Sequence, residues 1–124
     1  MGRPSEDVDE TIPAYHHGIG DVQLDRWIGY AVKVLRDGGL ETYESCQGGA
    51  GHSLPEPTVR FFGGPGEGHR ALVLALQLGL PVFAIRRVWQ VIDGEPHGPT
   101  WEMTFHRGRL EQVQREAESA GLIK

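Results

Sequence analysis

The residues best suited to chemistry lie together in one short stretch, Ser45-Cys46-Gln47-Gly48-Gly49-Ala50-Gly51-His52. It holds the chain's only cysteine, followed closely by glycines. Glycine adopts positive φ and lets a ligand approach the main chain, and successive N–H groups form nests that hold phosphates or carboxylates. We therefore predict that the loop binds a polar or anionic small molecule, with a nucleotide as one candidate. The predicted contacts are Ser45, Gln47, Gly48, Gly49 and Gly51.

Cys46 and His52 support a second hypothesis, a cysteine-dependent enzyme. A thiol at the end of a strand, beside loop N–H groups, is suited to nucleophilic attack when a histidine acts as its base. The alternative is a structural cysteine, since free cysteines are among the most buried residues. No metal site is predicted, because neither C-x-x-C nor H-E-x-x-H is present. Without a phosphate-loop or dinucleotide motif, the cofactor is left unassigned.

A second polar group is expected on two paired strands late in the chain. Alternation places Arg86 and Gln90 on one face of the first strand, and the predicted register sets Gln90 opposite Glu102 and Arg86 opposite His106. Arg60, on an earlier strand, is able to join them. Two interpretations stay open: a solvent-facing sheet surface with cross-strand ion pairs, or a ligand groove with Arg60, Arg86 and Glu102 as contacts.

Arg87 falls on the opposite, apolar face of the same strand, with Phe83, Ile85 and Trp89. A buried arginine needs a carboxylate or carbonyl partner. A bulge near Arg86-Arg87 would offer another solution, because it would shift the register and turn the side chain outward.

The elements that position these residues follow from hydrophobic periodicity. An amphipathic helix is expected after an N-cap at Asp21, with its apolar residues at helical spacing from Leu24 to Leu35. The later elements are strands at 40–46 and 58–62, a helix at 67–78, strands at 82–92 and 100–106, and a helix around 110–117. This α-β-β-α-β-β-α order predicts a single small α+β domain over residues 21–124. Its four-stranded, mainly antiparallel sheet carries helices packed on one face.

Composition narrows the classes of function. The chain has 124 residues and a net charge of −5, so nucleic acid is an unlikely partner. Acidic residues are concentrated in residues 1–20, which are predicted to form a disordered tail. No apolar run is long enough for a membrane span, and the lone cysteine and the lack of a secretion signal favour a cytoplasmic location.

The helix at 67–78 is apolar on most sides, which favours burial or a homodimer through this helix. A protein-interaction module without small-molecule chemistry is therefore a third hypothesis.

Two local resemblances accompany these patterns. The run Thr42-Tyr43-Glu44-Ser45-Cys46-Gln47-Gly48-Gly49 after a helix resembles the Ser-Cys-Ser-Gly-Arg strand end of the tRNA wybutosine-synthesis methyltransferase family, and Ser45, Cys46 and Gly48 match. Gln47 and Gly49 depart from that pattern; the resemblance implies methyl transfer and tRNA binding. The wider pattern from Glu44 to Phe61 looks like small uncharacterised bacterial or phage proteins, and this likeness implies no particular activity.

Overall fold

The computed structural model describes residues 11–12, 24–49, 51 and 54–123 and shows the predicted α+β fold. Two short strands, β1 (Thr11–Ile12) and β2 (Leu24–Asp25), pair with each other. The elements that follow are α2 (Arg26–Asp37), β3 (Glu41–Cys46), β4 (Thr58–Phe62), α3 (Glu67–Gln77), β5 (Val82–Ile92), β6 (Glu95–Phe105) and α4 (Arg107–Ser119). The predicted order of these main elements is confirmed. Within the described ranges, no helix is long and apolar enough to cross a membrane.

The amino-terminal predictions fall largely outside the described residues. This is so for Asp21, the expected N-cap, and for residues 1–10 and 13–20 of the expected tail. Thr11–Ile12, also within that range, form strand β1. The predicted start of the first helix is nevertheless wrong, because Leu24–Asp25 pair as strand β2 and α2 begins at Arg26, with Asp25 at its N-cap position.

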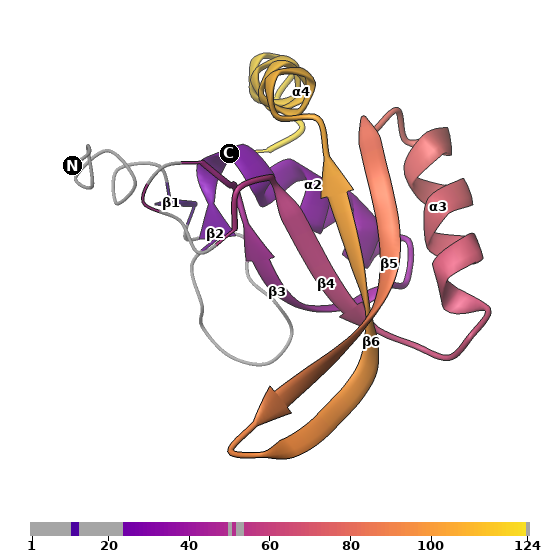
Figure 1. Ribbon diagram of the computed structural model, residues 1–124. Helices are drawn as coiled ribbons and strands as arrows, with labels where there is room; N and C mark the ends of the chain where they lie inside the picture. Colours follow the sequence, from indigo (N-terminus) through magenta and orange to yellow (C-terminus); the bar gives the residue numbers. More distant parts are fainter. Residues whose placement is uncertain (1–10, 13–23, 50, 52–53, 124) are drawn as a thin grey trace.

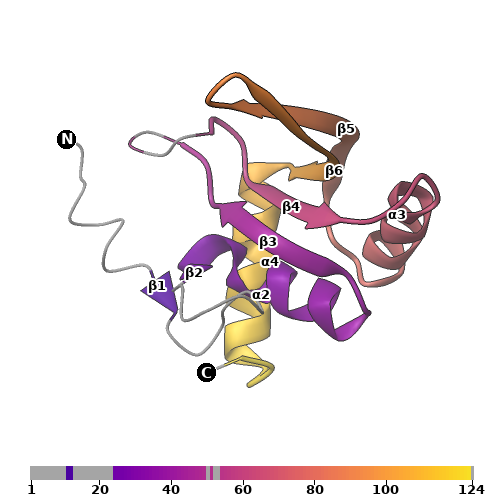
Figure 2. The same ribbon diagram turned by 90° about the horizontal axis from the view of Figure 1, so that it is seen from below.

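The four long strands form an antiparallel sheet in the order β3-β4-β6-β5 (Figures 1 and 2). Side chains alternate between its two faces, as the period of a strand requires. Val59 and Phe61 of β4, and Met103 and Phe105 of β6, are fully buried beneath the helices. The residues between them point to the other side, which we call the open face. The helices pack their apolar residues on the covered face. Of the apolar stripe predicted for the first helix, Ile28, Ala31, Val32 and Leu35 of α2 and Leu24 of β2 lie in the core, whereas Trp27 is only half-buried.

The register predicted for the β5–β6 hairpin is wrong. Strand β6 begins directly after a two-residue turn, Asp93-Gly94, whose φ angles are +53° and +80°. Aspartate followed by glycine is a preferred sequence for such a turn because both residues take positive φ. Arg86 therefore lies opposite Glu102, rather than opposite His106. Gln90 lies opposite His97, and the hairpin extends well beyond the rest of the sheet (Figure 1).

Arg87 stays on the covered side of the sheet and finds a carbonyl partner there. Its Nη1 donates to the main-chain oxygen of Gly63 at 2.8 Å, and its guanidinium lies 4.6 Å from the centre of the Trp101 ring. The irregularities of β5 lie between Val82 and Ala84 and near Trp89, not at Arg86-Arg87. Carbonyl and ring contacts thus satisfy this arginine without a local change of register.

Helix α3 fully buries only its small residues; Leu74 packs partly against the core, and Val73 and Leu76 are exposed. Gly68, Ala71 and Ala75 face the sheet. A Cβ on Gly68 would lie 2.5 Å from the Trp101 ring, so glycine allows the helix to approach it. Leu76 remains 60% exposed. Deep burial of the whole helix, one of the two expectations, is therefore not observed.

Candidate functional site

The glycine loop uses its main-chain donors inside the chain. The N–H of Gln47 donates to Asp25 Oδ2 at 3.1 Å, that of Gly48 to Cys46 Sγ at 3.4 Å, and that of Gly49 to the oxygen of Pro55 at 3.0 Å. Three consecutive N–H groups predicted to hold an anion thus already have acceptors. In this conformation an anion would have to compete with those bonds.

Gln47 is a structural link between this loop and the start of α2. Its side chain is buried, and its Oε1 accepts a hydrogen bond from the N–H of Trp27 at 3.2 Å. Trp27 lies in the first turn of the helix, where N–H groups lack partners within the helix. Together with the bond from its own N–H to Asp25, this contact holds the loop against α2. Ser45 lies opposite Val59, on the covered side of β3, and Gly51 is exposed with φ +84°.

The Cys46 thiol is less exposed than a catalytic nucleophile should be. Cys46 is buried at the end of β3, and its sulfur accepts the hydrogen bond from Gly48. His52, its predicted base, lies outside the described residues. The Cys46–His52 pair therefore stays a prediction. Across the described ranges, no group of three or more His, Cys, Asp or Glu side chains is arranged to hold a metal ion.

Four charged side chains cross the open face, one from each strand, and we call them the charge ladder: Glu44, Arg60, Glu102 and Arg86. Arg60 donates through Nη1 to Glu44 Oε1 at 2.8 Å and through Nε to Glu102 Oε2 at 3.0 Å. Arg86 donates through Nη2 to the other oxygen of Glu102. The structure thus brings together Arg60, Arg86 and Glu102, the three ligand contacts predicted on this face. Glu44 was missed, although alternation along β3 places it beside Arg60.

The electrostatics of the charge ladder keep its buried members ionised. The Glu102 side chain is only 4% exposed. Burial by itself would raise the pKa of this carboxyl, but the hydrogen bonds and charges of Arg86 and Arg60 outweigh burial and lower the pKa. Burial likewise favours a lower pKa for Arg60, whereas its bonds to Glu44 and Glu102 raise it. Glu102 and Arg60 are therefore both charged at neutral pH.

This arrangement predicts how stability depends on pH. Because the pKa of Glu102 is lower in the folded state than in the unfolded chain, its contribution is present at neutral pH and is lost as pH falls through the folded pKa. We expect Glu102→Gln to reduce the free energy of unfolding by about 2 kcal/mol at pH 7. The difference from the native protein should shrink below about pH 4, close to the usual glutamate pKa. Urea titrations at pH 7, 5, 4 and 3 measure the free energy of unfolding of both proteins, and Glu95→Gln, at an exposed position, is the control. If Glu102→Gln lowers the stability by the same amount at every pH, the lowered pKa of Glu102 is contradicted.

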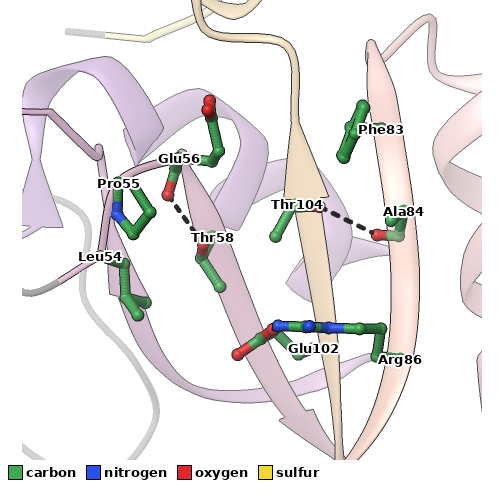
Figure 3. A pocket seen from close by; sticks show the side chains of 9 residues that line it. All are labelled: Leu54, Pro55, Glu56, Thr58, Phe83, Ala84, Arg86, Glu102 and Thr104. Carbon is green, nitrogen blue, oxygen red and sulfur yellow. Dashed lines mark hydrogen bonds and ion pairs between the residues drawn. The ribbon is translucent and has the colours of Figure 1, made fainter.

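A hollow of about 260 Å³ lies beside the charge ladder on the open face. Figure 3 shows Thr58 and Thr104 at its floor, with Arg86 and Glu102 at one end. One wall comes from the segment before β4 and the other from the start of β5; these walls are formed by Leu54, Pro55, Glu56, Phe83 and Ala84. Its surface is mostly apolar, with Arg86 and Glu102 at one end and the carboxylate of Glu56 at the other.

Phe83 is turned toward this hollow by a β-bulge. Val82 lies opposite Phe105 and Ala84 lies opposite Thr104, so that Phe83 is an extra residue in β5. Bulges re-aim side chains in this way. The Phe83 ring is 64% exposed and meets the His106 ring edge to face, at 5.3 Å between centroids. The expectation that Phe83 shares the apolar face with Ile85 and Trp89 is wrong for this reason.

A second hollow, of about 320 Å³, lies on the other side of Phe83, at the start of α4. Its lining includes Glu56, which it shares with the first hollow, and also His106, Arg107 and Gly108. Arg107 also donates through Nη2 to the oxygen of Pro55, and so fixes the wall shared by the two hollows. The alternation of strand residues gave no signal for Arg107, because it lies in the first turn of a helix.

Comparison with known proteins finds no matching protein-family model, curated protein or solved structure. The function of this site must therefore be argued from its own geometry.

Proposed function

We propose that the protein binds a small anionic molecule with a flat or apolar body, for which a nucleotide is one candidate. The site is the open-face hollow, rather than the N–H groups of the glycine loop. The observation that carries the proposal is Phe83, an exposed aromatic ring placed by a bulge between two hollows that each contain an arginine. An aromatic ring so exposed in a concave site offers a stacking surface for a planar ligand.

The chemistry of the first hollow favours a ligand with one anionic group. Leu54, Pro55 and Ala84 supply apolar contact around the ring of Phe83. At the end of the hollow, the Arg86 side chain is 68% exposed and uses Nη2 on Glu102. A guanidinium has five N–H donors, so that Arg86 is able to bind a carboxylate or phosphate as well.

The threonines at the floor add acceptors. Thr58 donates its hydroxyl hydrogen to the oxygen of Glu56 at 2.8 Å, and Thr104 donates to the oxygen of Ala84 at 3.4 Å. With their hydrogens directed to the main chain, both oxygens present lone pairs to donors of a ligand. A planar ring with N–H groups satisfies these acceptors while it stacks on Phe83.

The second hollow supports binding of a longer anion. It lies at the amino end of α4, where N–H groups and the helix dipole favour negative charge. The guanidinium of Arg107 adds a positive charge there. A ligand whose planar part stacks on one side of Phe83 would direct its anionic part toward Arg86 or Arg107. This arrangement fits a mononucleotide better than a simple inorganic anion.

A binding experiment with matched aromatic variants tests this proposal. We expect saturation-transfer NMR to detect binding from a panel of mononucleotides and aromatic carboxylates. Phe83→Ala should weaken the affinity at least about fivefold, since base–aromatic stacking contributes about 1–3 kcal/mol. Phe62→Ala is the control, because Phe62 is another exposed ring of the same sheet, stacked on Tyr43 instead. Binding that Phe83→Ala leaves unchanged, or a panel without any binder at millimolar concentration, contradicts the proposal.

Self-association through α3 is a second proposal, supported by its exposed apolar residues. Val73 and Leu76 lie on the outer side of this helix, away from the sheet. A homodimer through them would make the protein an interaction module as well as a binding domain. Leu76→Lys should then disrupt the dimer, because the charge would be buried at the interface.

A further inference from the structure

The outer half of the β5–β6 hairpin, residues 88–99, is the most exposed apolar part of the sheet, and we call it the hairpin arm. Strand β4 pairs with β6 only at Trp101–Thr104, so that the arm consists of two strands (Figures 1 and 2). Trp89, Val91 and Ile92 are 59%, 71% and 51% exposed. Two-stranded ribbons are only marginally stable alone in water. A ribbon with such residues is expected to gain stability from a partner.

The two edges of the arm differ in whether they accept another strand. Strand β6 contains Pro96 and Pro99, and its pairing with β5 is irregular beside them. Proline lacks the N–H that a neighbouring strand needs, and is a common way of protecting an edge. Val88 to Ile92 of β5 contain neither proline nor charge, and four of these five residues are valine, isoleucine or tryptophan. Within the described part of the chain, β5 pairs only with β6.

We propose that two copies of this chain pair through the β5 edges of their arms, antiparallel, with the two-fold axis at Gln90. Each four-stranded sheet would then continue into that of the other copy. In this register Trp89 lies opposite Val91 of the partner subunit, and Val88 lies opposite Ile92 of the partner subunit. Aromatic and β-branched residues in directly opposed positions are favourable cross-strand pairs. The two-fold axis makes each of these pairs occur twice.

The charges of the β5–β6 hairpin favour the same arrangement. Arg86 and Arg87 lie at the base of the arm, whereas Asp93 and Glu95 lie at its tip. Antiparallel pairing about Gln90 places Arg87 opposite Asp93 of the partner subunit at both ends of the interface. Parallel pairing would bring like charges together, which destabilises a sheet. Charge and apolar pattern thus select a second copy in one orientation.

Sedimentation equilibrium of the full chain tests the proposal. We expect a reversible dimer, and at least tenfold weaker association for Val91→Lys, because a charge on an edge strand opposes pairing. Leu122→Lys, an exposed leucine at the other end of the chain, is the matched control and should leave the dimer unchanged. A monomer at all concentrations up to 100 µM (about 1.4 mg/ml for a chain of this size) overturns the proposal. So does a dimer that Leu76→Lys disrupts and Val91→Lys does not, which would assign the interface to α3.

Cysteine crosslinking tests the register. Directly opposed residues in an antiparallel pair have Cα atoms about 4.5–5.5 Å apart, within the range that a disulfide spans. Gln90→Cys should therefore form a covalent dimer rapidly under mild oxidation. The native chain and Leu122→Cys should not, since Cys46 is buried and residue 122 is remote from the axis. Failure of Gln90→Cys to crosslink, in a protein that is dimeric by sedimentation, overturns the proposed axis. Neither measurement depends on a ligand, so this inference is independent of the proposed ligand binding. It competes with self-association through α3, and the comparison of Leu76→Lys with Val91→Lys decides between the two interfaces.

Discussion

Replacing Arg60 with methionine is expected to reduce the free energy of unfolding by about 3 kcal/mol. The Arg60 side chain is only 15% exposed and bonds to two carboxylates, those of Glu44 and Glu102. Methionine keeps most of the apolar volume but leaves the buried carboxylate of Glu102 with Arg86 as its remaining charged partner in the ladder. Loss of one member of a buried pair costs more than the pair contributes, because a buried charge is left uncompensated. Urea denaturation at pH 7, followed by circular dichroism, measures the change.

Two further variants separate this effect from an ordinary surface ion pair. Lys33→Met removes an exposed i,i+4 pair with Asp37, at 2.8 Å, and should cost only about 0.5 kcal/mol. The double variant Arg60→Met/Glu102→Leu removes the buried carboxylate too, and should recover much of the stability lost by Arg60→Met alone. If Arg60→Met reduces the free energy of unfolding no more than Lys33→Met does, the ladder behaves as a solvated surface network and contributes little to stability.

The sequence predicted the elements of the fold well because their signals are local. The apolar spacing from Ile28 to Leu35 specifies a helix by itself, and Gly38-Gly39 end it, although Leu24, the first residue of the predicted stripe, lies in strand β2. The hairpin register was not predicted, because it depends on whether Asp93-Gly94 closes a two-residue turn or begins a longer loop. Strand β6 includes Pro96 and Pro99, which the exposed edge of a ribbon accommodates. One misjudged turn thus moved Arg86 from Glu102 to His106 in the predicted pairing.

The candidate site was only partly predictable for a similar reason. Alternation along strands was enough to gather Arg60, Arg86 and Glu102 on one face. The position of Phe83 depends on a bulge, and Val82-Phe83-Ala84 contains no glycine or other residue that marks one. The role of the glycine loop was hidden as well, because partners distant in sequence, such as Asp25 and Pro55, take its N–H groups. Such contacts are properties of the assembled fold and leave no pattern in the loop itself.

Gly48→Ala is expected to be the most damaging small substitution in the loop, with a loss of about 3 kcal/mol in the free energy of unfolding. Gly48 has φ +80°, which disfavours any side chain. A Cβ there would also lie 2.6 Å from the carbonyl carbon of Glu56 and 2.7 Å from the nitrogen of Pro57. Both atoms belong to the main chain, so that relief requires movement of the segment that forms one wall of the hollow. Urea denaturation measures the loss.

Gly49→Ala is the matched control that separates backbone strain from close packing. Gly49 has φ +96°, but the nearest atom to a Cβ there would be Cζ of Arg107, at an ordinary 3.5 Å. It should therefore cost only about 1 kcal/mol, the strain of positive φ alone. A much larger loss of stability for Gly48→Ala than for Gly49→Ala would mean that position 48 requires glycine because the main chain of Glu56 and Pro57 packs closely against it. If both variants instead lose little stability but no longer bind the ligand, the anion binds to the N–H groups of the glycine loop. The open-face hollow would then not be its site.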